Sequence, residues 1–477
     1  MRVKMILPAL TEAKSPFWRP IKYSLFPPLG LATLAAHLDP EDEVVICDEH
    51  VEAVPPIPTE PAGTYDLVLI QVYITNARRA YELADHYRAQ GSHVCLGGLH
   101  VTSLPTEAAR RADTIFIGPG EESFPRFLLD YRWGRPLSCY RSETRSLVGV
   151  PPIRRDLIDR SHYLVPNSIV VSRGCPHHCT FCYKDSFFAG GRGFYTQAVD
   201  DALVEIDRLP GRHLYFLDDH LLGNPTFARQ LFGAMQGLGR RFQGAATVDS
   251  ILRGDLIEQA VGAGLRSLFV GFESLSEANL AATAKSQNNR DRYEEAIRRL
   301  SRLGVMINGS FVFGLDGDGP DVFDRTVDWA VANGLTTATF HIATPYPGTA
   351  YHAQLAAAGR ILHSNWDRYD TRQAVFRPAG MTIDQLEAGY HRAYDQFYSW
   401  ANLAAAACAS AAAADRIHGL RHLAYAAGWK RFEPAWNYLI KAGQLKQMRP
   451  LLEAILHSKI YQDPTSSRPV PRSRVQH

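Results

Sequence analysis

Short apolar runs alternate with helical stretches along most of the chain, and this alternation limits the fold more than any other feature. Five runs near the N-terminus have the length and composition of buried parallel strands. They cover residues 3–7, 43–47, 66–72, 93–98 and 114–118. Helical periodicity fills the segments between them, as in LGLATLAAHL and ARRAYELADHYRAQ. The pattern predicts a doubly wound, Rossmann-like α/β domain over residues 1–135, with ligands bound at the carboxyl ends of its strands.

A second series of strand and helix candidates follows a polar, proline-rich stretch that predicts a linker over residues 136–166. Six apolar runs alternate there with helical segments. They cover residues 168–172, 213–218, 244–248, 267–272, 307–314 and 337–342. Six such units favour a partial (β/α)6 barrel of TIM type over residues 167–360, with its chemistry at the strand carboxyl ends. Residues 361–462 predict a C-terminal helical region, and residues 463–477 predict a disordered tail.

Composition places the chain among ordinary globular proteins, with 46% hydrophobic and 21% charged residues. A net charge of +2 gives no reason to expect nucleic acid or an anionic membrane as a partner. No run of about 18 apolar residues predicts a transmembrane segment, and the first apolar run is too short for a signal peptide. The seven cysteines are an odd number for a disulfide framework. We therefore expect a cytoplasmic protein.

Three cysteines stand close together in SRGCPHHCTFC, where Cys175, Cys179 and Cys182 are spaced C-x3-C-x2-C. Thiolates this close repel one another unless a cation lies between them, so the spacing predicts a metal site. A structural zinc site normally takes four protein ligands, and His177 or His178 could supply a fourth only from inside the same short loop. An iron–sulfur cluster held by three thiolates leaves one iron open to another ligand.

With Phe181 before the last cysteine, and with barrel strands on both sides, this motif resembles the radical S-adenosylmethionine (SAM) superfamily. The resemblance implies that the three cysteines hold a [4Fe–4S] cluster, that SAM chelates the open iron, and that an electron from the cluster yields a 5′-deoxyadenosyl radical. FLDDH, VGFES and GSFVFGLDGD match segments that contact SAM in that family. The implied SAM contacts are Phe181, Asp218, Asp219, Glu273, Ser274 and Gly314. Taken singly, a helix cap at Asp219 or a loop ion pair at Glu273 explains these residues equally well.

The preceding α/β domain resembles the cobalamin-binding domain that many radical SAM enzymes carry. PPLGLATLAAHL, GGLHVTSLPTEA and IGPGEESFPRFL support this resemblance, and glycines after buried strands let the backbone approach a flat ligand. The implied cobalamin contacts are Pro28, Leu29, Gly97, Gly98, His100, Thr102, Gly118, Gly120 and Glu121. The D-x-H-x-x-G motif that supplies an axial histidine elsewhere is incomplete, because Ala53 replaces its glycine. We therefore interpret His50 as a loop or surface histidine, and His100 as a hydrogen-bonding residue.

Together these resemblances imply a cobalamin-dependent radical SAM C-methyltransferase that transfers a methyl group from methylcobalamin to an unactivated carbon of a small-molecule or lipid-like substrate. An electron donor such as flavodoxin or ferredoxin would reduce its cluster. Two alternatives stay open at this point. The same cofactors can support a cyclisation, rearrangement or oxidation without methyl transfer, and a zinc-binding or ligand-sensing module would need no catalysis at all. No residue is assigned to catalysis from the sequence.

Overall fold

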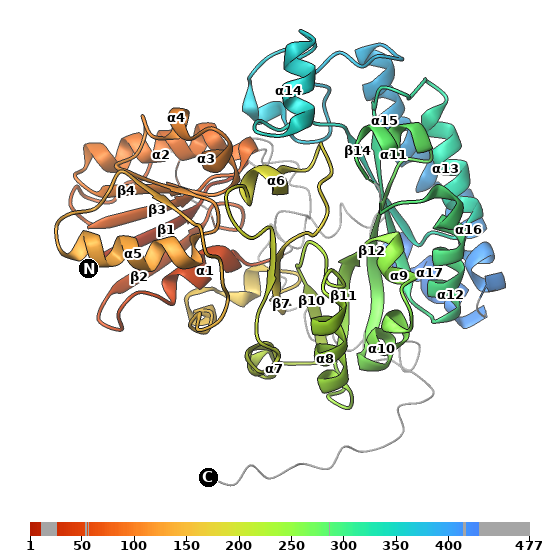
Figure 1. Cartoon of the computed structure of the whole chain (residues 1–477), viewed down its shortest axis with the longest axis horizontal. Coiled ribbons are helices and arrows are strands. Elements are labelled where there is room, and N and C mark those ends of the chain that lie inside the picture. The colour runs from red at the N-terminus through yellow and green to blue at the C-terminus, as the bar shows by residue number, and fades with distance from the viewer. Residues whose placement is uncertain (11–25, 53–54, 56, 286, 414–415, 429–477) are drawn as a thin grey trace.

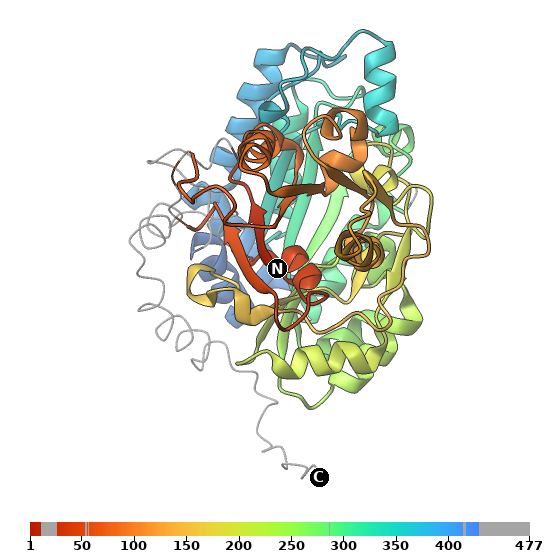
Figure 2. The same ribbon diagram turned by 90° about the vertical axis from the view of Figure 1, so that its left-hand side faces the viewer.

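The computed structural model describes residues 1–10, 26–52, 55, 57–285, 287–413 and 416–428. Two parallel β-sheets, each flanked by helices, lie side by side (Figures 1 and 2). The predicted tail at 463–477 and the last part of the predicted helical region, 429–462, lie outside the described residues. No helix in the described ranges has both the length and the apolar character needed to cross a bilayer.

The first sheet has six parallel strands in the order β2-β1-β3-β4-β5-β6. They are β1 (Arg2–Leu7), β2 (Glu43–Asp48), β3 (Leu67–Gln71), β4 (His93–Gly97), β5 (Thr114–Ile117) and β6 (Cys139–Arg141). The helices are α1 (Leu29–Ala35), α2 (Ala77–Ala89), α3 (Leu99–Ser103), α4 (Pro105–Ala108) and α5 (Gly120–Arg132). An apolar core lies on each face, one under α2 and one under α1 and α5. The predicted doubly wound arrangement is confirmed.

Strand β6 lies inside the segment that the sequence predicts to be a linker. It pairs with β5 through Ile115–Cys139, Phe116–Tyr140 and Ile117–Arg141. The Tyr140 ring is buried, and its hydroxyl donates to Asp130 of α5 at 2.6 Å. A three-residue edge strand with two exposed positions has no apolar alternation to reveal it. The first sheet therefore extends beyond the predicted boundary at residue 135.

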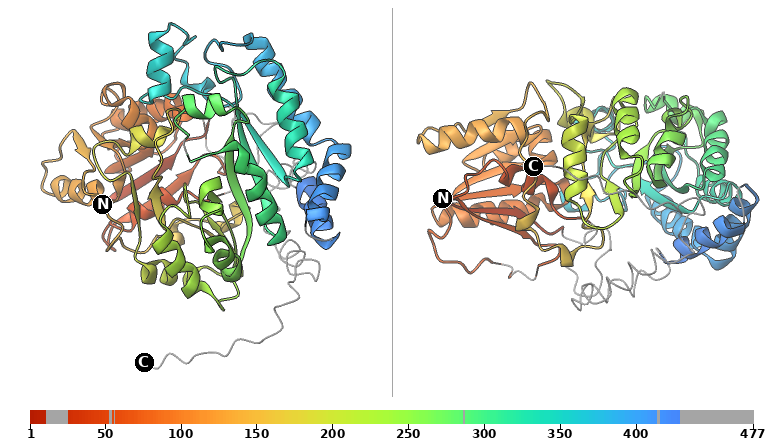
Figure 3. Two further views of the ribbon diagram at one scale, coloured as in Figure 1. Left: turned by 45° about the vertical axis from the view of Figure 1, so that its right-hand side comes forward. Right: turned by 90° about the horizontal axis from the view of Figure 1, so that it is seen from below.

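The second sheet has six parallel strands in the order β14-β13-β12-β11-β10-β7, so each strand pairs with its neighbour in the series. They are β7 (Ser168–Ile169), β10 (His213–Phe216), β11 (Arg241–Ala246), β12 (Leu265–Glu273), β13 (Met306–Phe313) and β14 (Thr337–Ile342). The intervening helices are α7 (Val199–Arg208), α8 (Pro225–Met235), α9 (Val248–Ile251), α10 (Leu256–Ala263), α11 (Glu277–Ala282), α12 (Tyr293–Arg302) and α13 (Val322–Ala332). The sheet curves into the predicted partial barrel, with helices outside (Figure 3).

The strand predicted over residues 168–172 is split. Its first part is β7, and its last residue begins β8 (Ser172–Gly174), which pairs antiparallel with β9 (Phe194–Thr196). The backbone N–H groups of Val171 and Ser172 donate to the carboxylate of Asp218 instead of continuing the barrel ladder. The chain thus leaves the barrel before the cysteines. It returns through α6 (Tyr183–Phe187) and β9.

Helices α14 (Ala350–Ala357), α15 (Ile383–Phe397), α16 (Trp400–Ala413) and α17 (Arg416–Ala426) follow the barrel. Helix α15 covers the outer strand β14. The Tyr398 hydroxyl donates to the carbonyl of Ala338 at 2.8 Å and accepts from its N–H at 3.1 Å. Tyr394 makes the same pair of bonds to Phe340. These two tyrosines therefore pack against the barrel and also satisfy the backbone of an edge strand.

Candidate active site at the junction of the two sheets

The cysteine loop runs from β8 to α6, and its three cysteines are free thiols. The pKa of Cys175 is raised to about 11, chiefly by burial and also by the neighbouring thiols of Cys182 and Cys179. The backbone N–H of His177 lowers the pKa of Cys175, and that of Lys184 acts in the same way on Cys182. The three sulfurs therefore lie within electrostatic reach of one another, and two of them already have N–H groups turned toward them.

Two ammonium groups lie beside this loop, that of Lys184 half-buried and that of Lys285 buried. Lys184 Nζ lies 3.0 Å from Asp219 Oδ1, and Lys285 Nζ lies 2.5 Å from Glu273 Oε1. Burial opposes the charge on Lys285, but the Glu273 carboxylate and the Cys179 thiol together raise the pKa of that ammonium. Positive charge beside the loop offsets the negative charge that thiolates and an iron–sulfur cluster would bring to it.

Three of the predicted SAM contacts have partners within the fold. Besides the backbone N–H groups of Val171 and Ser172, Asp218 accepts a bond from the Ser172 hydroxyl. Ser274 Oγ accepts a hydrogen bond from the backbone N–H of Ser276 at 3.1 Å. Gly314 has a φ of 89°, and its N–H donates to Asp318 Oδ2 at 3.0 Å. These residues also hold turns and strand ends, and their contact with SAM stays a prediction.

Phe181, Asp219 and Glu273 are the predicted SAM contacts that lie at the cysteine loop or in the ion pairs facing it. Phe181 packs half-buried against the barrel core. Glu273 adopts a φ of 65°, which is unusual for a residue other than glycine, where the pairing of β12 with β13 shifts register. Its carboxylate folds back over Gly271, where a Cβ would collide with it. All six predicted SAM contacts therefore stay candidates, and these three lie at the loop or in its ion pairs.

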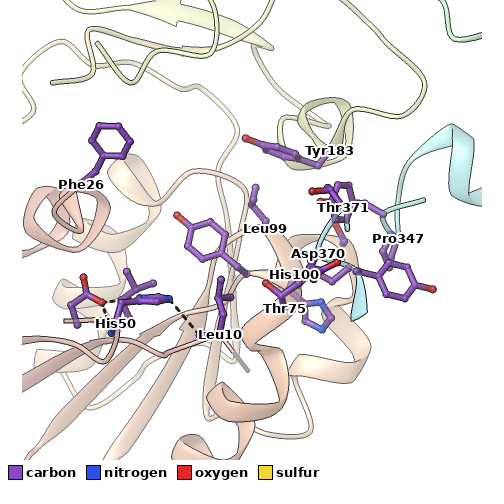
Figure 4. A pocket seen from close by; sticks show the side chains of 17 residues that line it. Leu10, Phe26, His50, Thr75, Leu99, His100, Tyr183, Pro347, Asp370 and Thr371 are labelled. Carbon is purple, nitrogen blue, oxygen red and sulfur yellow. Dashed lines mark hydrogen bonds and ion pairs between the residues drawn. The ribbon is translucent and has the colours of Figure 1, made fainter. Parts of the chain in front are cut away.

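A cavity of about 390 Å³ lies where the carboxyl ends of the two sheets meet (Figure 4). The first half of the chain contributes Leu7, Leu10, Phe26, Asp48, His50, Tyr73, Ile74, Thr75, Leu99, His100 and Ser103. The second half contributes Tyr183, Tyr346, Pro347, Tyr369, Asp370 and Thr371. Strand β1 lies between β2 and β3, so the connections from β1 and β3 part at this edge and open a crevice.

His50 lies in the turn after β2, as the loop interpretation expects, but it is buried in this cavity wall, so the surface interpretation is wrong. Its side chain is 6% exposed, and its Nδ1 lies 2.8 Å from Asp48 Oδ1. The other oxygen of Asp48 accepts a bond from the Tyr163 hydroxyl at 2.9 Å. A carboxylate bound from both sides fixes the plane of the imidazole and directs its Nε2 to the opposite side. Nε2 accepts from the backbone N–H of Leu10 at 3.4 Å.

Among the predicted cobalamin contacts, all of which lie in the described ranges, His100 lines the cavity. Its Nε2 lies 3.1 Å from Glu107 Oε1, and its ring meets the Trp366 indole edge-on at 5.7 Å. Its Nδ1 is buried without a hydrogen-bond partner. Because the Glu107 carboxylate can only accept, the imidazole proton lies on Nε2 and leaves Nδ1 as an acceptor. The position suits an amide or hydroxyl donor from a bound ligand.

Several other predicted cobalamin contacts also pack the first sheet. Gly98 has a φ of 115°, and a Cβ there would lie 2.8 Å from the carbonyl oxygen of Val72 on the neighbouring connection. Gly120 allows α5 to approach α1 closely. Pro28 precedes α1, and Leu29 is buried. Gly98 and Gly120 therefore permit close approach of other parts of the chain, and their contact with cobalamin stays a prediction.

Thr102, Gly118 and Glu121 also have partners in the fold. Thr102 Oγ1 accepts from the Gly118 N–H at 2.9 Å. Glu121 Oε1 lies 2.8 Å from Arg173 Nε, with both side chains largely buried. Arg173 belongs to β8, two residues before Cys175, so this ion pair joins the first half of the chain to the cysteine loop. The carboxylate of Glu121 is committed to that contact.

The cavity residues that the sequence did not single out come mainly from connections after β1, β2, β3 and β14. Tyr73 and Thr75 follow β3, and Tyr346 and Pro347 lie in the PYPGT turn after β14. Tyr369 to Thr371 come from the segment between α14 and α15. The rule that ligands bind at strand carboxyl ends points to the connections after the strands, but it does not say which connections turn toward the barrel.

Comparison with known proteins agrees with this geometry. A model of the radical SAM superfamily matches residues 169–330, and a model of the B12 binding domain matches residues 23–128. The chain is a cobalamin-dependent radical SAM enzyme. Bacteriochlorophyllide d C-12(1)-methyltransferase of Chlorobaculum tepidum is 28% identical to the enzyme over 384 residues, 78% of this chain and 82% of that protein.

Hopanoid C-2 methylase of Rhodopseudomonas palustris is 24% identical to the enzyme over 357 residues, 72% of this chain and 66% of that protein. Among solved structures, the cobalamin-dependent SAM radical enzyme OxsB, with aqua-cobalamin and SAM bound, superposes with a TM-score of 0.65 at 14% identity. That superposition covers 96% of this chain and 75% of OxsB, and it supports the fold assignment.

The residues of the junction fit a [4Fe–4S] cluster, SAM and cobalamin, the cofactors of this class of enzyme. Within the described ranges, no three His, Cys, Asp or Glu side chains converge on a point as ligands of a single metal ion do. A cluster takes its thiolates on separate irons, so its ligands need not converge. The three free thiols with two facing ammonium groups suit the cluster. The apolar crevice with the unpartnered acceptor of His100 suits the broad, amide-fringed corrinoid.

Proposed function

We propose that the enzyme methylates an unactivated carbon of an apolar, ring-containing small molecule or lipid. One observation supports this proposal most directly. Tyr183 follows Cys182 in the sequence and lines the cavity whose opposite wall is the carboxyl edge of the first sheet. With cobalamin on the sheet edge, a substrate on the barrel side of the cavity therefore lies between cobalamin and the cysteine loop. When bound, the cluster with SAM supplies a hydrogen-abstracting radical, and cobalamin supplies the methyl group.

The cavity walls serve to exclude water and to hold the substrate still. Tyr183, Tyr346 and Tyr369 form much of the barrel-side wall, and Leu7, Leu99 and Ile74 lie opposite. The negative charge of Asp219, followed by burial, raises the pKa of Tyr183, and burial raises that of Tyr346, so both phenols stay protonated. Neutral phenols add rigid apolar surface with a hydroxyl at its end. A dry enclosure protects a substrate radical from side reactions.

The charges of the cavity favour an uncharged reacting group. Apart from the tyrosines, its ionisable lining residues are Asp48, His50, His100 and Asp370, and none of the described residues that line it is Lys or Arg. A phosphate or carboxylate next to the reacting carbon would have no counter-charge there. Bacteriochlorophyllide and hopanoid, named in the two relatives, are large and largely apolar ring systems. We propose the same substrate class for this enzyme, and a flavodoxin or ferredoxin as its electron donor.

The test is a labelled turnover experiment. The chain is reconstituted without oxygen with iron, sulfide and cobalamin, reduced, and given SAM carrying a deuterated methyl group. Bacteriochlorophyllide and a hopanoid serve as probes, and mass spectrometry follows the products. We expect 5′-deoxyadenosine, S-adenosylhomocysteine and a deuterated methyl group on the organic product. Formation of 5′-deoxyadenosine with a changed but unlabelled product would contradict methyl transfer and favour cyclisation, rearrangement or oxidation.

A further inference from the structure

Cys179 differs from the other two cysteines in the source of its hydrogen-bond donor. The backbone N–H groups of His177 and Lys184, in the same loop, lower the pKa of Cys175 and of Cys182. The Sγ of Cys179 instead lies 3.4 Å from the side-chain Nε2 of Gln287, 108 residues further along the chain. The backbone N–H groups of His177 and Lys184 remain after any substitution except proline. The donor to Cys179, in contrast, is the side-chain amide of Gln287.

Hydrogen bonds hold Asn288, next to Gln287, and Thr283, four residues before it. Asn288 Nδ2 donates to the carbonyl oxygens of Gly271 and Phe272 at 2.9 Å each. On the other side, the backbone N–H of Thr180 in the cysteine loop donates to the carbonyl of Thr283 at 3.0 Å. Asn288, next to Gln287, is therefore tied to the end of β12, and Thr283 is tied to the cysteine loop. The Gln287 amide lies beside Cys179.

The chemistry of the contact fixes the orientation of the amide. A thiolate can only accept, so the NH₂ group of Gln287 faces Cys179 and its Oε1 points away. Oε1 is buried without a hydrogen-bond partner beside a second cavity of about 450 Å³, lined also by His177, Asp249, Asn289 and Arg292. An N–H bond to a cluster thiolate stabilises the more negative, reduced state, and such bonds are among the factors that set cluster potentials.

We propose that Gln287 is a positioning residue that raises the reduction potential of the cluster through its hydrogen bond to Cys179. In the affected step one electron passes from the donor to the cluster, and no bond forms or breaks. The inference depends on the cluster but not on the reaction that the cluster starts. It can therefore fail while methyl transfer is observed, and it can succeed while methyl transfer is not.

The test is an EPR-monitored redox titration of the full chain with cluster and cobalamin bound. Gln287→Leu keeps a similar size and removes the donor. We expect the ratio of reduced to oxidised cluster at a fixed potential to fall about tenfold, which corresponds to a midpoint about 59 mV lower. Gln287→Glu places an acceptor and a negative charge at the same position, and we expect a larger fall.

Asn289→Ala is the matched control, because this amide lines the same second cavity and contacts no cysteine. We expect it to leave the midpoint of the cluster unchanged. The titration reports only on chains that carry a cluster, so reduced iron loading in a variant does not obscure the result. Wild-type midpoints in both Gln287 variants, or an equal shift in Asn289→Ala, would overturn the proposal.

Discussion

Helix α6, which follows the cysteine loop, and the carboxyl edge of the first sheet line the same cavity, but the two regions differ in their polar groups. Around the loop, the half-buried Lys184 pairs with Asp219, and the buried Lys285 pairs with Glu273. Along the sheet edge, none of the described lining residues is Lys or Arg, and apolar side chains lie beside hydroxyls, two histidines and the Asp48 carboxylate, which is held by hydrogen bonds. A compact anionic cluster needs fixed counter-charge, whereas a large neutral corrinoid needs shape and a few well-placed donors and acceptors.

The largest expected effect is a loss of activity from the cysteine loop with no change in cobalamin binding at the first sheet. Cys179→Ala removes a cluster ligand, so we expect 5′-deoxyadenosine formation to fall to the background level. Cobalamin binding, which depends on the other region, should stay at the wild-type level. Mass spectrometry of 5′-deoxyadenosine and equilibrium binding of hydroxocobalamin measure the two effects. Cys408→Ala, at an exposed cysteine of α16, is the control and should change neither. Full activity of Cys179→Ala would contradict the cluster assignment.

The ion pairs of the loop should be costly to break. Lys285→Met leaves the Glu273 carboxylate buried without its partner, and we expect a loss of about 3–5 kcal/mol of stability, seen as a lower melting temperature of the cofactor-free chain. The double variant Glu273→Gln, Lys285→Met should recover part of the loss. The surface pair of Arg78 and Glu82 gives the comparison, since Arg78→Met should cost only about 0.5 kcal/mol. Equal losses would contradict the distinction.

Asp218 gives the cysteine side a pH dependence. Burial raises its pKa from 3.8 to about 6, so between these values the folded chain holds a proton that the unfolded chain has lost. Stability from this group is therefore greatest below pH 4 and decreases as the pH rises to about 6, by up to about 3 kcal/mol. Urea unfolding at pH 4.5 and pH 7 should show a flatter dependence in Asp218→Asn. The exposed Asp207→Asn should keep the wild-type slope.

The smallest effect concerns the neutral side of the cavity. His100→Phe keeps a ring against Trp366 but removes the buried Nδ1 acceptor. We expect cobalamin to bind about tenfold more weakly, as for the loss of one hydrogen bond. His86→Phe, in which the replaced histidine contacts Gln90 away from the cavity, should bind cobalamin normally. An unchanged affinity in His100→Phe would show that its acceptor does not meet the cofactor.

Patterns within one segment predicted most of the fold. The strands of both sheets follow from apolar runs, and the cysteine motif gave the cluster loop because its three ligands lie within eight residues. The exceptions depend on distant partners. Strand β7 ends early because Asp218 takes the N–H groups of Val171 and Ser172, and nothing near those residues in the sequence reveals this.

The candidate site was harder to predict than the fold for the same reason. Burial of His50 depends on Asp48 beside it and on Tyr163, 115 residues beyond that carboxylate. The role of Gln287 depends on a cysteine in another β/α unit. Glycines are weak indicators of a ligand, because Gly98 also has a packing role against the backbone of Val72. Residue type states what a side chain can do, but the tertiary contact decides what it does.

The phenols of Tyr394 in α15 and of Tyr398 at its C-cap have a consequence for the edge of the second sheet. A complete barrel hides its last strand by pairing it with its first, which six strands in an open series do not do. Tyr394 and Tyr398 each satisfy one N–H and one carbonyl of β14, as a seventh strand would. Helix α15 thus acts as a substitute strand that terminates the sheet laterally. Loss of both hydroxyls would leave β14 as an edge strand with unpaired N–H and C=O groups, to which a strand of a second molecule could pair.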